Sequence, residues 1–431
     1  MQISANNPNR KSWLPVSEGC DFPIQNIPFG VFLTKDDIIT IGTRIGDYVI
    51  DLGAFHQLGY FKGIPLTDDM FMQDSLNDFI SDGRKTWRLV RNRIADVFDA
   101  KNPDLRDNPK NREIIIFDIK DVEMLLPINV GDFTDFSSSK EHATNISLMF
   151  RGKENSLTPN WLHFPIGYHG RASSIVVSET LIRRPYGQSL PFGEENPIFG
   201  PSKSVDMELE TAFVTTDANN FGEPVPVDEA RDYIFGMVLL NDWSARDIQQ
   251  WEYVPLGPFM GKSFATTMSP WIVTLDALEP FKCEGAKKEL KPLPYLQQKL
   301  KESSYDIKLE AYLQTENGDE NLLTKTNFKY MYWSMSQQLA HHTVNGCNIR
   351  SGDLMGSGTI SGPTKESLAS MLELTLGGKE PITLKDGSTR SFFNDGDIVT
   401  LKGYCTKDTV RIGFGNCTGK ILPPLKYKFP K

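Results

Sequence analysis

The sequence has few cysteines and no pairing pattern among them. Its five cysteines are scattered through 431 residues, and their spacing matches no zinc-binding motif. An odd number without such a pattern is typical of reduced thiols in a cytosolic protein, where disulfides are rare. The sequence therefore predicts neither a disulfide framework nor a zinc site, and it favours a cytoplasmic location.

Long apolar runs and an excess of basic charge are also missing. No stretch of about 18 apolar residues occurs, so no membrane span is expected. Residues 1–16 contain no apolar run resembling a signal peptide. The formal net charge is −9 and the pI is about 5.3. These values argue against a general nucleic-acid binder, but not against an anionic substrate, because a local cluster of Lys and Arg can outweigh the average.

The remaining composition is that of a globular protein. Hydrophobic residues make up 39% of the chain and charged residues 23%, both ordinary values. The length is sufficient for a sizeable core and two domains. We expect a mainly β (α+β) chain with a first domain at 1–122 and a second at 123–431, the boundary falling within 118–128.

The first hundred residues predict a small β-rich unit followed by a helix. Short apolar segments separated by turn signals indicate strands at 29–33, 38–41 and 48–52, which fits a small barrel. From Trp87, apolar residues recur at helical spacing. The basic residues on the other faces of this helix are interpreted as a solvated surface; they are Arg84, Lys85, Arg88, Arg91 and Arg93. A polar connector at 101–112 and an apolar strand at 114–117 follow.

Strand signals dominate the rest of the chain. The clearest lie at 233–240, 271–275, 307–313, 398–401 and 411–414. Asp386-Gly387 predicts a hairpin between 382–384 and 389–393. Residues 329–344 have helical spacing, and 185–204, rich in Pro and Gly, predict a long loop.

Two glutamates, Glu208 and Glu210, stand at i and i+2 in an apolar segment. In a strand such residues project from one face, where like charges repel unless a cation lies between them. With Asp135 and Asp242 as partners, they indicate an all-oxygen site for a divalent metal. The alternative is a pair of solvent-facing strand residues.

Other polar residues near this pair have competing interpretations. Asp242 ends an apolar run, where a carboxylate seldom lies without a partner. Asp135 and His142 suit a functional pair, although a cap or a surface histidine gives the same pattern. Lys262 is either a surface amine or a cation facing Asp242, and Arg246 either forms a structural salt bridge with Asp247 or serves the site.

Two further patterns are rejected. The glycine-rich segment 356–359 lacks the lysine of a phosphate-binding loop, so nucleotide binding is not expected. His341 and His342 are adjacent in a predicted helix and point about 100° apart, so they do not suit a shared zinc ion and are assigned to packing.

Taken together, these segments resemble the fumarylacetoacetase family. The resemblance covers most of the chain and is densest between 132 and 420. Its most specific strings are 160–163, 167–174, 241–261, 345–348, 357–363 and 411–415. It implies an SH3-like N-terminal barrel, a C-terminal β-roll or β-sandwich, and a homodimer built through the C-terminal domain. The implied activity is hydrolysis of the carbon–carbon bond of the diketo acid 4-fumarylacetoacetate to fumarate and acetoacetate, the last step of tyrosine and phenylalanine breakdown.

The resemblance also implies roles for individual residues. The catalytic Ca²⁺ ligands are Asp135, Glu208, Glu210 and Asp242, and a structural Mg²⁺ lies beside Asp242 at Lys262 and Thr266. His142 is the general base, oriented by Glu373. The groups around the leaving enolate are Arg246, Gln249 and Lys262. The substrate contacts are Ser137, Arg151, Tyr168, Gln249, Tyr253 and Thr359.

Two positions depart from the family pattern. Ser137 stands where a substrate-contacting tyrosine is expected, and Ala265 replaces a glycine near the magnesium position. We interpret both as changes that adjust the activity without abolishing it. Relatives with the same fold hydrolyse acylpyruvates, decarboxylate oxaloacetate or isomerise diene-dioates, and a metal-binding scaffold without catalysis is the non-enzymatic alternative. The N-terminal barrel and the 167–174 string favour fumarylacetoacetase, and His142, Glu373 and Lys262 argue against the scaffold.

Overall fold

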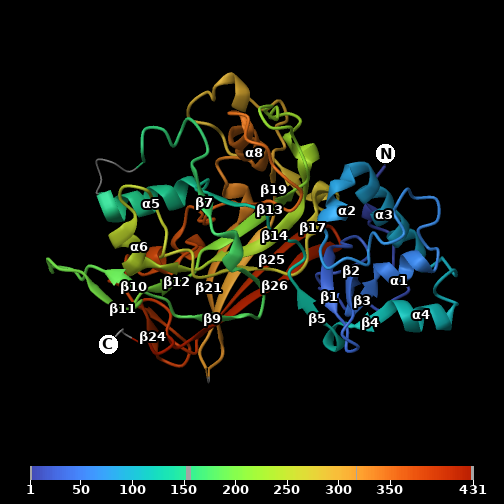
Figure 1. Ribbon diagram of the computed structural model, residues 1–431, viewed down its shortest axis with the longest axis horizontal. Helices are drawn as coiled ribbons and strands as arrows, with labels where there is room; N and C mark the ends of the chain where they lie inside the picture. The colour runs from blue at the N-terminus through green and yellow to red at the C-terminus, as the bar shows by residue number, and fades with distance from the viewer. Residues whose placement is uncertain (1, 152–156, 317, 429–431) are drawn as a thin grey trace.

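The computed structural model describes residues 2–151, 157–316 and 318–428, apart from the side chains of residues 150 and 151. Figure 1 shows an N-terminal unit, in blue, beside a larger unit built mostly of strands. The described residues form a mainly β structure with a small N-terminal β unit, which confirms the predicted fold class. The domain boundary at 122/123 stays a prediction.

The N-terminal sheet is antiparallel and has the strand order β4-β3-β2-β1-β5. Its strands are β1 (Phe29–Leu33), β2 (Ile39–Ile45), β3 (Tyr48–Asp51), β4 (Ile116–Asp118) and β5 (Glu123–Leu125). The helices of this unit are α1 (Leu52–Gln57), α2 (Asn77–Ser81), α3 (Gly83–Phe98) and α4 (Pro109–Ile115). The first three strands agree with the sequence prediction.

An eight-stranded sheet forms the centre of the molecule, in the order β7-β6-β22-β13-β14-β16-β8 with β17 also paired to β14. Its strands are β6 (Phe133–Phe136), β7 (Gly167–Gly170), β8 (Ile175–Val177), β13 (Leu209–Thr215), β14 (Ile234–Asp242), β16 (Thr266–Met268), β17 (Val273–Thr274) and β22 (Leu354–Gly356). Most neighbours are antiparallel, whereas β6 with β22 and β8 with β16 are parallel.

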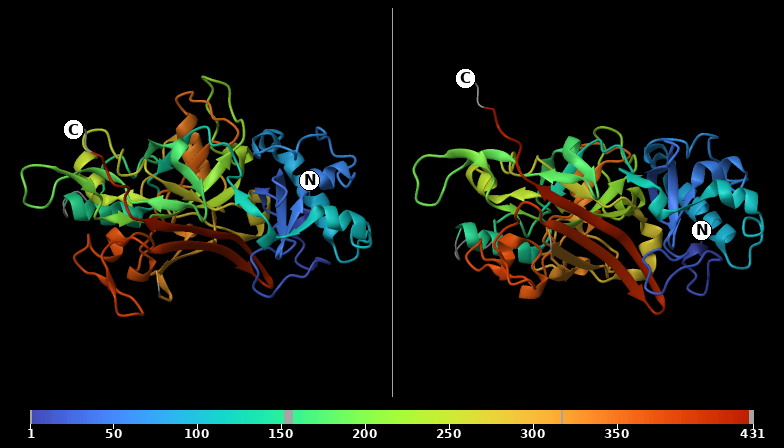
Figure 2. Two further views of the ribbon diagram at one scale, coloured as in Figure 1. Left: turned by 60° about the horizontal axis from the view of Figure 1, so that its bottom comes forward. Right: turned by 90° about the horizontal axis from the view of Figure 1, so that it is seen from below.

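A third sheet has the order β21-β20-β25-β26-β9. Its strands are β9 (Leu181–Arg183), β20 (Lys308–Gln314), β21 (Glu320–Asn327), β25 (Ile398–Lys407) and β26 (Val410–Leu422). The long β25 and β26, red in Figure 2, extend toward the N-terminal unit, where Gly413 N–H donates to Asp21 O at 2.8 Å.

Four two-stranded sheets, five α-helices and several short 3-10 helices complete the larger unit among the described residues. The strand pairs are β10 (Tyr186–Ser189) with β11 (Ile198–Pro201), β12 (Val205–Asp206) with β15 (Ser244–Ala245), β18 (Lys282–Cys283) with β19 (Ser304–Tyr305), and β23 (Ile382–Thr383) with β24 (Thr389–Arg390). The α-helices are α5 (Lys140–Arg151), α6 (Arg246–Glu252), α7 (Leu275–Leu278), α8 (Met335–Thr343) and α9 (Met371–Leu374).

Both faces of the central sheet are buried. On β14, Met237 and Leu239 belong to the core shared with the third sheet, whereas Val238 and Leu240 belong to the core shared with the N-terminal unit. Alternate side chains of a strand point to opposite faces, so the central sheet lies between two apolar layers. This explains why β14 reads as a continuous apolar run rather than as an alternating pattern.

Four predictions of secondary structure are wrong in part. Residues 185–204 are not a structureless loop, because β10 and β11 pair within them. The helix expected at 329–344 begins only at Met335, because Ser334 forms a capping box with Gln337. The expected connector at 101–112 and strand at 114–117 also differ, because α4 begins at Pro109 and β4 only at Ile116. The hairpin at Asp386-Gly387 is confirmed.

The basic residues of α3 are only partly solvated, because Lys85 is exposed as predicted but the arginines have partners. Arg91 is 1% exposed, and its guanidinium donates to the carbonyl of Asn26 at 3.1 Å. Arg88 pairs with Asp276 of α7 at 2.6 Å, and Arg84 pairs with Asp232. Arg84 and Arg88 therefore attach the helix to the larger unit, whereas Arg91 attaches it to the N-terminal segment. Periodicity alone does not reveal these contacts.

Candidate active site

Four buried carboxylates meet on neighbouring strands of the central sheet. Asp135 lies on β6, Glu208 directly before β13, Glu210 at the second position of β13, and Asp242 at the end of β14. Each offers an oxygen atom, and these four atoms all lie within 4.8 Å of one another. Glu208 is 6% exposed and Glu210 is 0% exposed, so the interpretation of this pair as solvent-facing is wrong.

The intervening strand has a glycine where these acids approach one another. Gly356 of β22 pairs with Asp135 on one side and with Ala212 of β13 on the other. A Cβ atom at Gly356 would lie 2.6 Å from Asp135 Oδ1 and 3.3 Å from Glu210 Oε2. The absence of a side chain therefore opens the space into which both carboxylates project.

The glycine-rich segment after β22 contributes a backbone donor. The Gly358 N–H donates to Asp135 Oδ1 at 3.2 Å and to Glu210 Oε2 at 3.1 Å. Gly358 has φ +76°, and a Cβ there would lie 2.0 Å from the Phe136 carbonyl oxygen. The sequence pattern that did not fit a phosphate loop thus holds carboxylates in place.

Two buried cations pair with the acids. Lys262 Nζ lies 2.6 Å from Glu208 Oε2 and 2.7 Å from Asp242 Oδ2. Arg246 Nη1 lies 2.7 Å from the other oxygen of Glu208. Burial would raise the pKa of Glu208, but the charges of Lys262 and Arg246 outweigh it and hold that pKa below its usual range. Both cations thus serve the site, and the alternatives of a surface amine and of an Arg246–Asp247 salt bridge do not hold.

Asp135 and Glu210, in contrast, form no ion pair with Lys262 or Arg246 among the described residues. Burial, followed by the charges of Asp242 and Glu208, raises the pKa of Asp135 to about 8. Burial and the charge of Asp135 raise the pKa of Glu210 well above its ordinary value. Removing solvent from several like charges favours their protonated forms. A further positive charge at the site would therefore stabilise the ionised carboxylates.

The donor set fits a divalent cation. All four groups are carboxylates, the hard oxygen ligands that Ca²⁺ and Mg²⁺ prefer. Glu210 Oε1 is buried and has no hydrogen-bond partner among the described residues, so a ligand atom remains available. This buried acidic cluster can hold a divalent metal. Its geometry suits both Ca²⁺ and Mg²⁺.

The expected magnesium position next to the cluster contains Thr266 and Lys262. Thr266 Oγ1 donates to Asp242 Oδ1 at 2.9 Å. Burial would lower the pKa of Lys262, but Asp242 and Glu208 outweigh it and raise that pKa, so its Nζ is an ammonium with no lone pair for a metal. A metal ligand from Lys262 would therefore have to be its backbone carbonyl, and the predicted ligand set stays a prediction.

His142 and Glu373 form a hydrogen-bonded pair at the same site. His142 lies in the first turn of α5 and Glu373 in α9, and His142 Nδ1 is 2.8 Å from Glu373 Oε2. The His142 side chain keeps 13% of its surface exposed, whereas that of Glu373 is 0% exposed. With Nδ1 bonded to the carboxylate, Nε2 is the nitrogen left to accept a proton.

Three neighbours hold Glu373 in its ionised form. Asn145 donates to Oε1 at 2.8 Å, Ser361 to Oε2 at 2.8 Å and Ser370 to Oε2 at 2.9 Å. Burial would raise the pKa of Glu373, but His142 and these donors outweigh it and lower that pKa. Sequence reasoning missed all three neighbours. Only Asn145 had a local signal, since it lies one helical turn after His142.

Two of the remaining predicted contacts, Tyr168 and Gln249, bond to residues of the site. Tyr168 of β7 donates to Asp242 Oδ2 at 3.0 Å, and Gln249 Oε1 accepts from Arg246 at 3.1 Å. Thr359 Oγ1 is buried and has no hydrogen-bond partner among the described residues. Tyr253 follows the last residue of α6 and is half-buried.

Three further residues with predicted roles are Ser137, Ala265 and Arg151. Ser137 directly follows β6, and its carbonyl accepts from the Trp161 indole at 2.9 Å. Ala265 is buried, 4% exposed, immediately before β16. The side chain of Arg151 lies outside the described residues.

The two adjacent histidines of α8 are packing residues, as predicted. His342 Nε2 lies 2.8 Å from Thr134 Oγ1, and the His341 ring stacks on Phe164. Burial lowers the pKa of both imidazoles, which favours their neutral forms.

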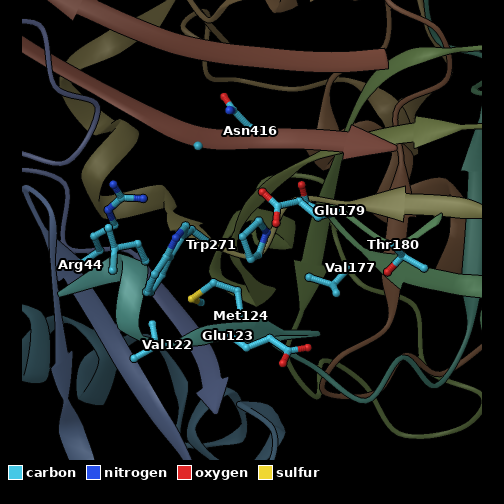
Figure 3. A pocket seen from close by; sticks show the side chains of 13 residues that line it. Arg44, Val122, Glu123, Met124, Val177, Glu179, Thr180, Trp271 and Asn416 are labelled. Atoms are coloured by element: carbon cyan, nitrogen blue, oxygen red, sulfur yellow. The ribbon is translucent and has the colours of Figure 1, made fainter. Parts of the chain in front are cut away.

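One cavity reaches the site, and a larger one is lined by other residues. The first, of about 190 Å³, is lined by Asp242, Lys262, Thr266 and Tyr168 among others, so it reaches one side of the acidic cluster. The second, of about 580 Å³, lies between the N-terminal unit and the larger unit, and Figure 3 shows Arg44 and Trp271 at its wall. None of the predicted site residues lines this second cavity.

Comparison with known proteins identifies the family. Residues 25–127 match the fumarylacetoacetase N-terminal model, and residues 133–422 match the fumarylacetoacetate (FAA) hydrolase C-terminal model. The chain is 51% identical over 416 residues to the fumarylacetoacetase of Arabidopsis thaliana, covering 96% of this chain and 98% of that protein. The chain belongs to the fumarylacetoacetase family. The Homo sapiens fumarylacetoacetase is 51% identical over 418 residues, covering 96% of this chain and 99% of that protein.

A solved member of the fumarylacetoacetate hydrolase group shares the fold at low identity. The fumarylacetoacetate hydrolase from psychrophilic Exiguobacterium antarcticum is 17% identical to this chain, with a TM-score of 0.51. The match covers 92% of this chain and 99% of that one. Among the described residues, no helix is long and apolar enough to span a membrane.

Proposed function

We propose that this member of the fumarylacetoacetase family hydrolyses 4-fumarylacetoacetate to fumarate and acetoacetate. The observation that carries this proposal is the hydrogen-bonded pair of His142 and Glu373 beside a buried cluster of four carboxylates. The near full-length identity of about half to proteins named fumarylacetoacetase supports the same reaction.

His142 would act as the general base. An imidazole is chemically suited to take a proton from the attacking water near neutral pH. Glu373 accepts the Nδ1–H, which fixes the tautomer and stabilises the imidazolium formed in the step. The activated water adds to the carbonyl carbon next to the fumaroyl double bond and gives a tetrahedral alkoxide.

Collapse of the alkoxide breaks the carbon–carbon bond. The electron pair leaves with the acetoacetate fragment as an enolate, whose charge is spread onto oxygen, and protonation completes the reaction. Arg246 has a buried Nη2 without a hydrogen-bond partner among the described residues, so it can donate to that oxygen. Because Gln249 accepts from Arg246 through Oε1, its amide N–H groups are also free to face the substrate. Lys262 adds positive charge beside the carboxylates of Glu208 and Asp242.

The substrate contacts follow from the polar groups around the site. Tyr168 stays protonated, because burial and the nearby carboxylates raise its pKa well above its ordinary value. Its hydroxyl and that of Thr359 would contact substrate oxygens, as would Tyr253, Ser137 and Arg151. When held by Asp135, Glu208, Glu210 and Asp242, a divalent cation would supply Lewis-acid stabilisation of the diketone oxygens.

The proposal extends to cofactors, assembly and location. We assign Ca²⁺ to the four carboxylates and Mg²⁺ to the position of Asp242, Lys262 and Thr266. The protein would be a cytoplasmic homodimer joined through the C-terminal domain, acting in the last step of tyrosine and phenylalanine breakdown. Light scattering after size exclusion tests the dimer, because a mass of one 48.6 kDa chain would contradict it.

An ultraviolet assay tests the reaction. Loss of the conjugated diketone absorbance is followed with 4-fumarylacetoacetate, and acylpyruvate and oxaloacetate are run beside it as substrates of related enzymes. The proposal predicts the highest kcat/KM for 4-fumarylacetoacetate. A higher value for either comparator, or no turnover of any of the three, contradicts it.

A further inference from the structure

Asp206 is a buried acid that neither the metal cluster nor the base pair includes. It ends β12, two residues before Glu208, and is 0% exposed. Four donors surround its carboxylate. Oδ1 accepts from the amides of Met207 at 2.8 Å and Met371 at 2.7 Å, and Oδ2 accepts from the amide of Leu372 at 3.0 Å. The fourth donor is a guanidinium.

The two amides from α9 directly precede Glu373. Met371 and Leu372 form the first turn of that short helix, so their bonds to Asp206 fix the helix start against β12. Glu373 is the next residue, and its carboxylate faces His142. The position of the base-orienting carboxylate therefore depends on Asp206 through the backbone.

The fourth donor is Arg246 Nε, at 2.8 Å from Asp206 Oδ2. The same guanidinium reaches Glu208 at 2.7 Å and Gln249 at 3.1 Å through Nη1. Because Asp206 holds Nε, the Nη1 and Nη2 groups are directed away from it, toward the metal cluster and the space for the leaving fragment.

We propose that Asp206 is a positioning residue that couples the two halves of the reaction, holding Glu373 for proton transfer and Arg246 for the departing enolate through one carboxylate. This inference rests on the proposed function. Asp206 touches neither substrate nor water in this scheme, and its effect is transmitted through α9 and Arg246.

The test is Asp206→Asn, which keeps the size but removes one acceptor oxygen and the charge. Whichever way the amide is turned, its NH2 group faces two of the four donors, so either Leu372 and Arg246 or Met207 and Met371 lose their acceptor. Displacement of catalytic groups by about 1 Å typically costs about 100-fold in rate. We expect kcat to fall about 100-fold, with a much smaller change in KM.

Asp397→Asn is the matched control. Asp397 is 1% exposed and accepts from Arg390 at 2.8 and 3.0 Å and from the amide of Asn394 at 2.8 Å. Among the described residues it forms no hydrogen bond with a proposed catalytic residue. Both variants should lower the melting temperature, but only Asp206→Asn should lower kcat. Equal kcat values for the two folded variants overturn the proposal.

A second variant and a measurement on the wild type test the proposal even if Asp206→Asn does not fold. If Asp206→Asn does not fold, Asp206→Glu keeps the charge and shifts the carboxylate by one methylene, and its kcat should still fall; an unchanged kcat overturns the proposal. In the wild type, the amide hydrogens of Met371 and Leu372 must exchange slowly, and rapid exchange overturns it independently of activity. An inactive wild type with protected amides would instead contradict the proposed function alone.

Discussion

His142 and Glu373 are separated by 231 positions in the chain, yet Nδ1 of one lies 2.8 Å from Oε2 of the other. The contact brings α5 and α9 together beside the carboxylates of the central sheet. This geometry gives the imidazole a fixed tautomer and leaves Nε2 for a proton.

The first prediction concerns the base. His142→Ala should abolish turnover while leaving metal binding intact, because a general base contributes about 100- to 10,000-fold and His142 is not among the clustered carboxylates. Turnover is measured by the ultraviolet assay and metal affinity by calorimetry. Near-normal turnover in the variant would show that another group deprotonates the water.

The second prediction concerns acid stability. The pKa of Glu373 is lowered in the folded protein, so the carboxylate stabilises the fold above its ordinary pKa of 4.5, and this contribution is lost as the pH falls through the lowered value. Glu373→Gln removes this titration. Chemical unfolding at a series of pH values should show a smaller loss of stability on acidification in the variant. An equally steep loss in both proteins would contradict the assignment.

The third prediction concerns metal binding and protons. Without metal, Asp135 with a pKa of about 8 is mostly protonated at pH 6 and mostly ionised at pH 9. The pKa of Glu210 is raised as well. A cation requires the ionised forms, so metal affinity should rise with pH by about tenfold per unit for each proton released. Calorimetry in buffers of different ionisation enthalpy measures that release.

Activity should disappear after EDTA treatment and return with Ca²⁺ or Mg²⁺; full activity after exhaustive chelation would rule out a metal requirement.

The fourth prediction concerns the glycine between the acids. Gly356→Ala places a methyl group 2.6 Å from Asp135 Oδ1, which should weaken metal binding and cost about 1–3 kcal/mol of stability. Gly200→Ala is the control, since nothing lies within 4 Å of its added Cβ. Calorimetry and thermal unfolding compare the two variants, and an unchanged metal affinity in Gly356→Ala would show that Asp135 and Glu210 do not need this space.

Local sequence patterns predicted part of the site. Asp242 ends an apolar run, so a buried carboxylate with a partner could be inferred, whereas the alternation of Glu208 and Glu210 with apolar residues fitted both a metal site and a solvent-facing pair. Gly356 could not be inferred, because its role depends on the register that places β22 between β6 and β13. Local spacing cannot supply a register between distant strands.

The same limit applies to the charged residues. Arg91 occupies a polar position in a helical pattern, but tertiary contacts bury it against backbone carbonyls. Asp206 continues the alternation of Glu208 and Glu210, and this signal was available, yet only the folded chain shows that it faces α9 and Arg246 instead of the metal cluster. Spacing alone does not show whether a charged side chain is buried or which partners it binds.

Hydrolysis of a carbon–carbon bond is the central claim, and product analysis in ¹⁸O-labelled water tests it most directly. With 4-fumarylacetoacetate as substrate, fumarate and acetoacetate should form in equal amounts. Mass spectrometry should find one ¹⁸O in a carboxylate of fumarate and none in the carboxylate of acetoacetate. Unequal products, or fumarate without the label, would contradict the account.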